Sequence, residues 1–225
     1  MISWTGPVGK LKKLVASLLV GASLTAAVGC DLRTSLKRFA YEGFGRDRWQ
    51  RPEQVLDSLG IEKGDRVADL GSGSGYFTLR LAEAVGPAGV VYAVDVDSLM
   101  NESVLRRAAK KGITNITAIV ARVDDPLLPP QGVDLIFTSN TYHHIDNRAD
   151  YFERAKSYLR PGGRIAILDY NSKGWLLRTL DHSTPKEVIL KEMEKAGYRL
   201  GQDFEFIPRQ SFLTFVLEPD SVNNP

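Results

Sequence analysis

Between residues 66 and 169 short apolar segments alternate with helical segments, and this alternation constrains the fold more than any other feature. Strand patterns are expected at residues 66–70, 90–94, 116–120, 133–138 and 164–169, and helix patterns at 76–85, 98–110 and 147–159. Strands that alternate with helices form a mostly parallel sheet. We therefore expect a doubly wound α/β domain over residues 61–225, which follows a helical lead-in over residues 31–60.

The last forty residues depart from this alternation. A helix is expected up to Ala196, opened by a capping box from Thr184 to Glu187 and closed by Gly197. Two strand patterns follow, at residues 204–206 and 211–217. Their short connection predicts an antiparallel hairpin at one edge of the sheet.

Residues 1–30 are typical of a secretory signal. Lys10, Lys12 and Lys13 precede an uncharged apolar run over residues 14–28, which at ~22 Å of helix is too short for a ~30 Å hydrocarbon core. Cys30, the only cysteine, lies two residues after this run, in a pattern that resembles the lipobox of bacterial lipoproteins. That resemblance implies a lipidated Cys30 and a membrane-anchored domain on the periplasmic side. The alternative is an uncleaved anchor that leaves the domain facing the cytosol.

Charge and cysteine content exclude several classes of function. Residues 1–30 contribute three lysines and no acidic residue, so the rest of the chain carries a net charge of −1. A near-neutral body gives no electrostatic reason to expect a nucleic-acid partner. A single cysteine excludes an internal disulfide and any multi-cysteine metal site.

A glycine-rich turn follows the first strand. It reads Asp69-Leu-Gly-Ser-Gly-Ser-Gly75, with glycines at positions 71, 73 and 75. Glycine permits a tight turn and lets a ligand approach the backbone closely. The dinucleotide fingerprint would need a further glycine at position 76, where this chain has Tyr76. The observed spacing, preceded by an acid, resembles motif I of class I S-adenosylmethionine-dependent methyltransferases.

The resemblance covers residues 46 to about 170 and implies both a fold and a cofactor. The implied fold is a Rossmann-like, mostly parallel seven-stranded sheet in the order 3-2-1-4-5-7-6. The implied cofactor is S-adenosyl-L-methionine, with Asp95 on the ribose hydroxyls and Val96 on the adenine. The third contact, on the adenine amino group, would fall by position at Arg122, so Asp124 or Asp125 is expected to substitute, or the Val123 backbone to bond the ring. The remaining expected cofactor-binding residues are Asp69, Gly71, Ser72, Gly73, Gly75, Tyr76 and Asn140.

Candidate catalytic residues follow the fourth strand. In this topology the strand order reverses between strands one and four, where open α/β sheets bind their ligands. Tyr142, His143 and His144 should therefore face the methyl donor, and a histidine there can take a proton from a nucleophile. The alternatives are a histidine that packs or caps the next helix, and a metal site that also uses Asp169. Adjacent histidines rarely share one ion, so no metal is expected.

These features together predict a methyltransferase that acts on a small molecule by direct displacement at the sulfonium methyl group. The small size of the acceptor is inferred because no additional domain or basic surface is apparent, and we expect a monomer. The rival hypothesis is a non-catalytic protein that binds a nucleoside or S-adenosylmethionine at a membrane surface.

Overall fold

The computed structural model describes residues 45–171 and 183–218, all within one compact unit, Glu42–Pro225. The expected signal segment with Cys30, and residues 31–44 of the expected lead-in, lie outside the described residues.

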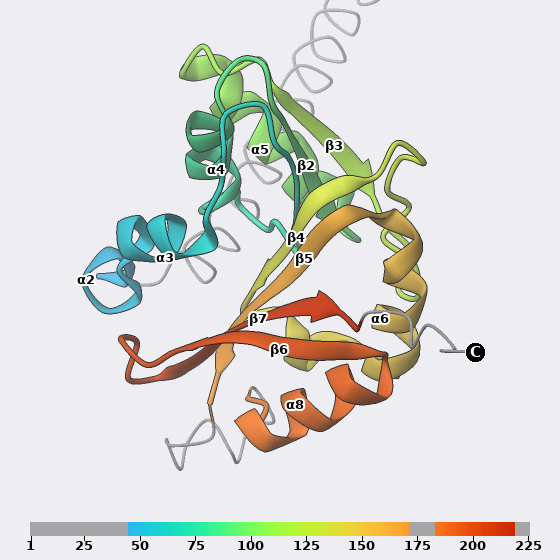
Figure 1. Cartoon of the computed structure of the whole chain (residues 1–225). Helices are drawn as coiled ribbons and strands as arrows, with labels where there is room; N and C mark the ends of the chain where they lie inside the picture. The colour runs from blue at the N-terminus through green and yellow to red at the C-terminus, as the bar shows by residue number, and fades with distance from the viewer. Residues whose placement is uncertain (1–44, 172–182, 219–225) are drawn as a thin grey trace, which may run out of the picture. The chain divides into compact units, whose positions relative to one another are not determined.

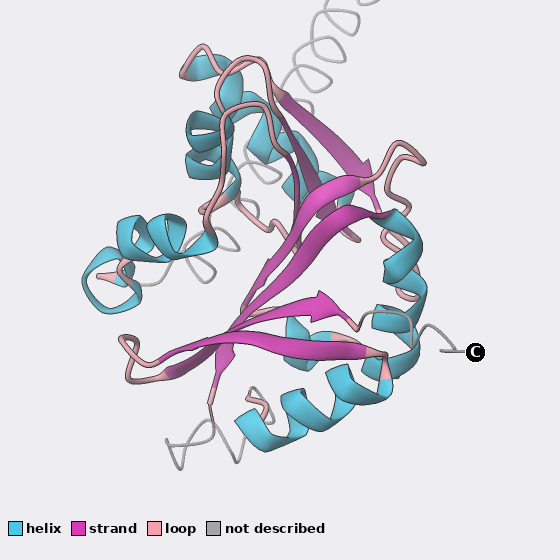
Figure 2. Cartoon of the chain, viewed as in Figure 1, coloured by secondary structure: helices cyan, strands magenta, loops and turns pink. Residues whose placement is uncertain are grey.

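The described domain is built on one seven-stranded sheet (Figures 1 and 2). Its strands are β1 (Arg66–Leu70), β2 (Val90–Asp95), β3 (Ile116–Val120), β4 (Val133–Ser139), β5 (Leu159–Tyr170), β6 (Tyr198–Phe204) and β7 (Gln210–Leu217). Their order is β3-β2-β1-β4-β5-β7-β6, with β1 to β5 parallel and β7 antiparallel to both β5 and β6. The predicted Rossmann-like methyltransferase fold is therefore confirmed, including the antiparallel edge hairpin.

Helices cover both faces of this sheet. The α-helices are α2 (Arg46–Gln50), α3 (Pro52–Leu59), α4 (Thr78–Val85), α5 (Ser98–Lys110), α6 (Arg148–Ala155) and α8 (Lys186–Lys195). Short 3-10 helices, η1 (Tyr142–His144) and η2 (Lys156–Tyr158), flank α6. Helix α5 packs against β2, β3 and α4, and α8 packs against β6 and α6.

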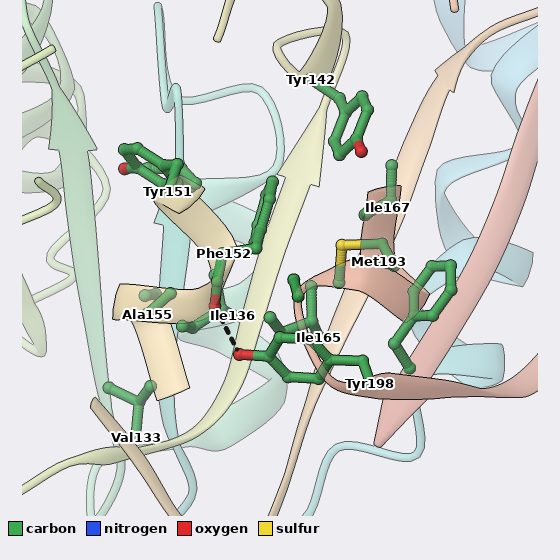
Figure 3. Close-up of a cluster of buried hydrophobic side chains, with 14 of the residues drawn as sticks. Val133, Ile136, Tyr142, Tyr151, Phe152, Ala155, Ile165, Ile167, Met193 and Tyr198 are labelled. Atoms are coloured by element: carbon green, nitrogen blue, oxygen red, sulfur yellow. Dashed lines mark hydrogen bonds between the residues drawn. The ribbon is translucent and has the colours of Figure 1, made fainter. Parts of the chain in front are cut away.

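Two buried clusters stabilise the two faces. On one face Val55 and Leu59 of α3 and Leu81 of α4 pack on the sheet, and all three are at most 2% exposed. On the other face Phe152 of α6 and Met193 of α8 pack beside the strands, as Figure 3 shows. Each such side chain contributes roughly 1.5–3 kcal/mol through burial. The carboxyl ends of the parallel strands are thereby held in a fixed arrangement.

Four of the predicted element boundaries are wrong. The fifth strand, expected at residues 164–169, is β5 at Leu159–Tyr170, because Leu159 already pairs with Val133 of β4. The sixth strand lies at Tyr198–Phe204 instead of residues 204–206, because it is an exposed edge strand whose polar residues give no apolar pattern. The helix expected to Leu159 ends as α6 at Ala155 and tightens into η2. The expected capping box does not form, since α8 begins at Lys186 and its N-cap is Pro185, with no side-chain cap.

Within the described residues, no helix combines the length and apolar character needed to cross a membrane.

Candidate active site

The glycine turn between β1 and α4 has the backbone conformation that its sequence predicts. Gly71, Gly73 and Gly75 all have positive φ angles, of 75°, 51° and 83°. Such angles strain residues that carry a Cβ. A Cβ at Gly71 would also overlap the side chain of Thr141, which follows β4. The turn therefore brings the backbone of β1 directly against the segment after β4.

Asp69 lies beneath this turn and is 2% exposed. Its carboxylate accepts a 2.6 Å hydrogen bond from the Thr78 hydroxyl at the start of α4. Burial raises the pKa of Asp69 to about 6, against the lowering effects of Thr78 and the nearby Arg46 guanidinium. A buried carboxylate of this kind favours a cationic group close to the turn.

Asp95 ends β2 and lies beside the same turn. Its Oδ2 accepts a 2.8 Å hydrogen bond from the Gly73 amide, and its Oδ1 accepts one of 2.9 Å from the Asp97 amide. Burial is the largest cause of its raised pKa. The Val96 amide bonds to this carboxylate as well. A carboxylate offers about four acceptor positions, so Asp95 retains capacity for a hydroxyl group of a ligand.

The next residues form an exposed rim. Val96 is 59% exposed and Val123, after β3, is 79% exposed, so apolar side chains flank the tip of β2. The Asp124 side chain is 61% exposed and pairs with Arg122 at 3.2 Å. The structure thus places the adenine-side candidates at the surface, with Asp124 engaged in a local ion pair.

His143 is tied to the end of β5. Asp169 is fully buried, and its Oδ1 lies 2.8 Å from His143 Nδ1 while its Oδ2 accepts the His143 amide at 3.1 Å. An ionised carboxylate only accepts hydrogen bonds, so the proton of the neutral imidazole sits on Nδ1 and Nε2 is the basic nitrogen. Sequence reasoning considered Asp169 only as a metal ligand and missed this pairing.

The other two candidates after β4 differ from His143 in burial. His144 is exposed, with its ring centroid 4.1 Å from that of His143. Tyr142 is fully buried in the cluster of Figure 3, stacked on Phe152, and its hydroxyl donates to Glu192 at 2.8 Å. The structure therefore brings the two histidines together but places Tyr142 in the core between the sheet and the helices.

Helix α2 reaches the site from the N-terminal side. Its Arg46 guanidinium lies 3.8 Å from the centroid of the Tyr76 ring, and that ring also carries Arg80 at 4.3 Å. The Tyr76 hydroxyl donates to Asp47 at 2.5 Å. Tyr76 thus holds α2 against the glycine turn, and its ring makes cation–π contacts with both arginines.

Three amide side chains extend this contact across the sheet. Gln50 of α2, which is fully buried, accepts from Arg46 Nε and donates to Gln210 Oε1 at 2.9 Å. Gln210 of β7 in turn donates to Asn140 Oδ1. Sequence reasoning missed Arg46, Gln50 and Gln210 as site residues, although residues 46–52 belong to the segment that resembles the family.

Over residues 45–171 and 183–218, no group of three or more histidine, cysteine or acidic side chains is arranged to hold a metal ion.

Comparison with known proteins identifies the class of domain. Residues 61–203 match the family described as a methyltransferase domain, and the chain belongs to this family. A solved S-adenosylmethionine-dependent methyltransferase from Aquifex aeolicus superposes with a TM-score of 0.74 at 25% identity, over 82% of this chain and 98% of that one. The predicted S-adenosylmethionine-dependent methyltransferase domain is thus confirmed at the level of family and fold.

Two curated relatives are similar over part of their length. The ubiquinone/menaquinone biosynthesis C-methyltransferase UbiE of Francisella philomiragia is 27% identical over 68% of this chain and 59% of its own length. The aklanonic acid methyltransferase DauC of Streptomyces sp. (strain C5) is 32% identical over 46% of this chain and 47% of its own. The chain therefore spans about half to three fifths of these relatives.

Proposed function

We propose that this protein transfers a methyl group from S-adenosyl-L-methionine to a small-molecule acceptor. The observation that carries the proposal is the pairing of the glycine turn with Asp95, whose carboxylate accepts the Gly73 and Asp97 amides at the tip of β2. UbiE and DauC are named for quinone biosynthesis and aklanonic acid, which supports a small acceptor.

The residues of the turn fit this cofactor in charge and in hydrogen-bonding capacity. Among the described residues, the buried Ser72 hydroxyl has no hydrogen-bond partner, so a polar ligand group at the turn would satisfy it. Asp69 supplies buried negative charge for a ligand that carries an ammonium and a sulfonium. Asp95 would hold the ribose hydroxyls, and Val96 would cover the adenine.

The chemistry divides between the cofactor and the protein. When bound, S-adenosylmethionine supplies an electrophilic methyl group whose bond to sulfur breaks, with the electron pair returning to sulfur. The protein orients the acceptor in line with that bond. His143 Nε2 takes the proton of an acidic acceptor, and Asp169 stabilises the resulting imidazolium through Nδ1. The acceptor's electron pair then forms the new bond to the methyl carbon.

Calorimetric titration of the full-length chain tests the cofactor assignment. We expect S-adenosylhomocysteine to bind with a dissociation constant in the micromolar range, and NAD not to bind. Binding of NAD with no response to S-adenosylhomocysteine would overturn the proposal.

A pair of histidine variants tests the proton acceptor. His143→Ala should keep S-adenosylhomocysteine binding but lower turnover by about 10²-fold, because it removes the nitrogen held by Asp169. His144→Ala is the comparison variant, since the Asp169 carboxylate bonds to the ring of His143. Turnover is measured as S-adenosylhomocysteine release with a panel of phenols, thiols and amines. Full activity of His143→Ala would show that positioning alone carries catalysis.

A further inference from the structure

Four side chains from α2, β7 and the segment after β4 form a continuous hydrogen-bonded relay at the carboxyl edge of the sheet. It runs from Arg46 to Gln50 in α2, then to Gln210 in β7, and ends at Asn140 directly after β4. The two glutamines are at most 3% exposed, and Asn140 is half-buried. Ser139 Oγ also accepts from Arg46 and Gln50, at 3.3 Å each, which adds a branch to the relay.

The arginine gives this relay a fixed direction. A guanidinium donates hydrogen bonds and never accepts them, so the Gln50 atom that faces Arg46 must be its oxygen. The Gln50 nitrogen then faces Gln210, which presents its own oxygen there and its nitrogen to Asn140. Asn140 must therefore turn its oxygen toward Gln210 and its Nδ2 group the other way.

The position of Asn140 makes the direction of this amide important. Its backbone has a φ of 57°, and its backbone N–H donates to the carbonyl oxygen of Leu168 in β5 at 2.9 Å. The residue is thereby anchored between β4 and β5. In the part of the chain that the structure describes, the Asn140 Nδ2 group donates to no other residue. Thr141, the next residue, contacts the glycine turn, and His143 follows two positions later.

We propose that Asn140 presents an N–H donor to an oxygen of the methyl acceptor, so that the site selects phenols or enols over amines. This inference rests on the proposed methyl transfer and names the acceptor class for it. A phenolate or enolate oxygen accepts the Nδ2 hydrogen bond after its proton has passed to His143. An amine nitrogen at the same place has a single lone pair, which the attack on the methyl carbon uses, so the Asn140 N–H is left without an acceptor.

Ring-matched pairs of phenols and anilines test this selectivity without turnover. Each pair differs only in a hydroxyl or an amino group, for example 4-nitrophenol and 4-nitroaniline, and is titrated into the complex with S-adenosylhomocysteine at pH 8. We expect the phenol members to bind about 10-fold more tightly or better, the usual effect of one hydrogen bond to a charged group. Asn140→Asp should abolish or reverse this preference, since a carboxylate presents an acceptor in place of the donor.

A variant away from Asn140 tests whether the orientation of the Asn140 side-chain amide, and not its packing, sets the preference for phenols. Gln50→Glu still accepts from Arg46 but has no hydrogen to donate, so Gln210 and Asn140 are free to turn over and present the Asn140 oxygen. The preference for phenols should then fall by about 10-fold although no residue that faces the acceptor has changed. Gln54→Glu adds the same charge at an exposed position of the next helix, α3, and should leave the preference unchanged.

The outcomes keep the two proposals apart. Failure of S-adenosylhomocysteine to bind the wild-type chain would contradict the proposed function itself. Normal S-adenosylhomocysteine binding, with anilines bound as tightly as phenols, would overturn the acceptor assignment and leave the cofactor intact. A phenol preference that survives both Asn140→Asp and Gln50→Glu would likewise overturn it. Circular dichroism of each variant verifies folding, and Gln50→Glu decides the matter where Asn140→Asp does not fold.

Discussion

The buried charge of Asp69 makes a quantitative prediction about stability. Burial raises its pKa from the usual 3.8 to about 6, and each pKa unit corresponds to about 1.4 kcal/mol. The ionised carboxylate therefore costs the folded state up to about 3 kcal/mol relative to the protonated one. Asp69→Asn removes this charge, while the asparagine oxygen still accepts the hydrogen bond from Thr78. At pH 8 the variant should be more stable than the wild type by up to about 3 kcal/mol.

The pH window follows from the direction of the shift. Between about pH 4 and pH 6 the folded protein holds a proton on Asp69 that the unfolded chain has lost, so wild-type stability falls as the pH rises. Below pH 4 the carboxyl group is neutral in both states, and the difference between variant and wild type should approach zero. Urea unfolding at pH 4, 5, 6 and 8 measures the difference, which should reach its full value near pH 7.

A matched control and a ligand arm complete the experiment. Asp57→Asn removes an exposed carboxylate on α3 and should give a small difference that does not follow this pH curve. Because a cationic ligand favours ionised Asp69, S-adenosylmethionine binding at pH 6 should release a proton from the wild type but not from Asp69→Asn. Buffers with different ionisation enthalpies measure this release. A variant less stable than wild type at pH 8, or a difference independent of pH, would refute the electrostatic reasoning.

Three further predictions concern the turn, the strand tip and the N-terminal segment. Asp95→Ala should weaken S-adenosylhomocysteine binding by about 2–3 kcal/mol in calorimetric titration, and unchanged affinity would contradict its ribose role. Gly71→Ala should lower the free energy of unfolding by roughly 1–3 kcal/mol beyond the effect of Gly112→Ala, which has a similar φ of 70° but no neighbour within 4 Å. We also propose that Cys30 is lipidated: intact mass should show loss of residues 1–29 and an acyl group, whereas an unmodified chain that retains Met1 would exclude this.

The inner parallel strands β1, β2 and β4 could be predicted from the sequence because most of their residues are buried. The edge strand β3 is partly exposed, but its Ile116–Val120 segment is rich in β-branched residues, which favour strands. β1 and β3 begin and end where their apolar runs do, and β2 and β4 extend one residue beyond theirs. β6 is an edge strand like β3, but its exposed residues 199–203 are mostly polar. β6 is held in the sheet by backbone hydrogen bonds to β7, and these do not require alternating apolar side chains that could be recognised in the sequence.

The site could be predicted where local spacing encodes it. Three glycines followed by an acid one strand later mark the turn and Asp95, because both are set by one β-α-β unit. The bond between His143 and Asp169 joins residues 26 apart, and that between Gln50 and Gln210 joins residues 160 apart. Such pairs form only after β4, β5 and β7 have been placed side by side, so residue spacing carries no sign of them.

The residues that bind the cofactor and the residues that orient Asn140 lie in different parts of the chain. The family match spans residues 61–203 and includes the glycine turn, Asp95 and Asn140 itself. The residues that set the direction of Asn140 lie outside that span, because Arg46 and Gln50 precede it and Gln210 follows it. The donor side of the site therefore belongs to the shared core of the fold, while segments at both ends orient the group offered to the acceptor. Exchange of those end segments between related domains should change acceptor preference while cofactor binding is retained.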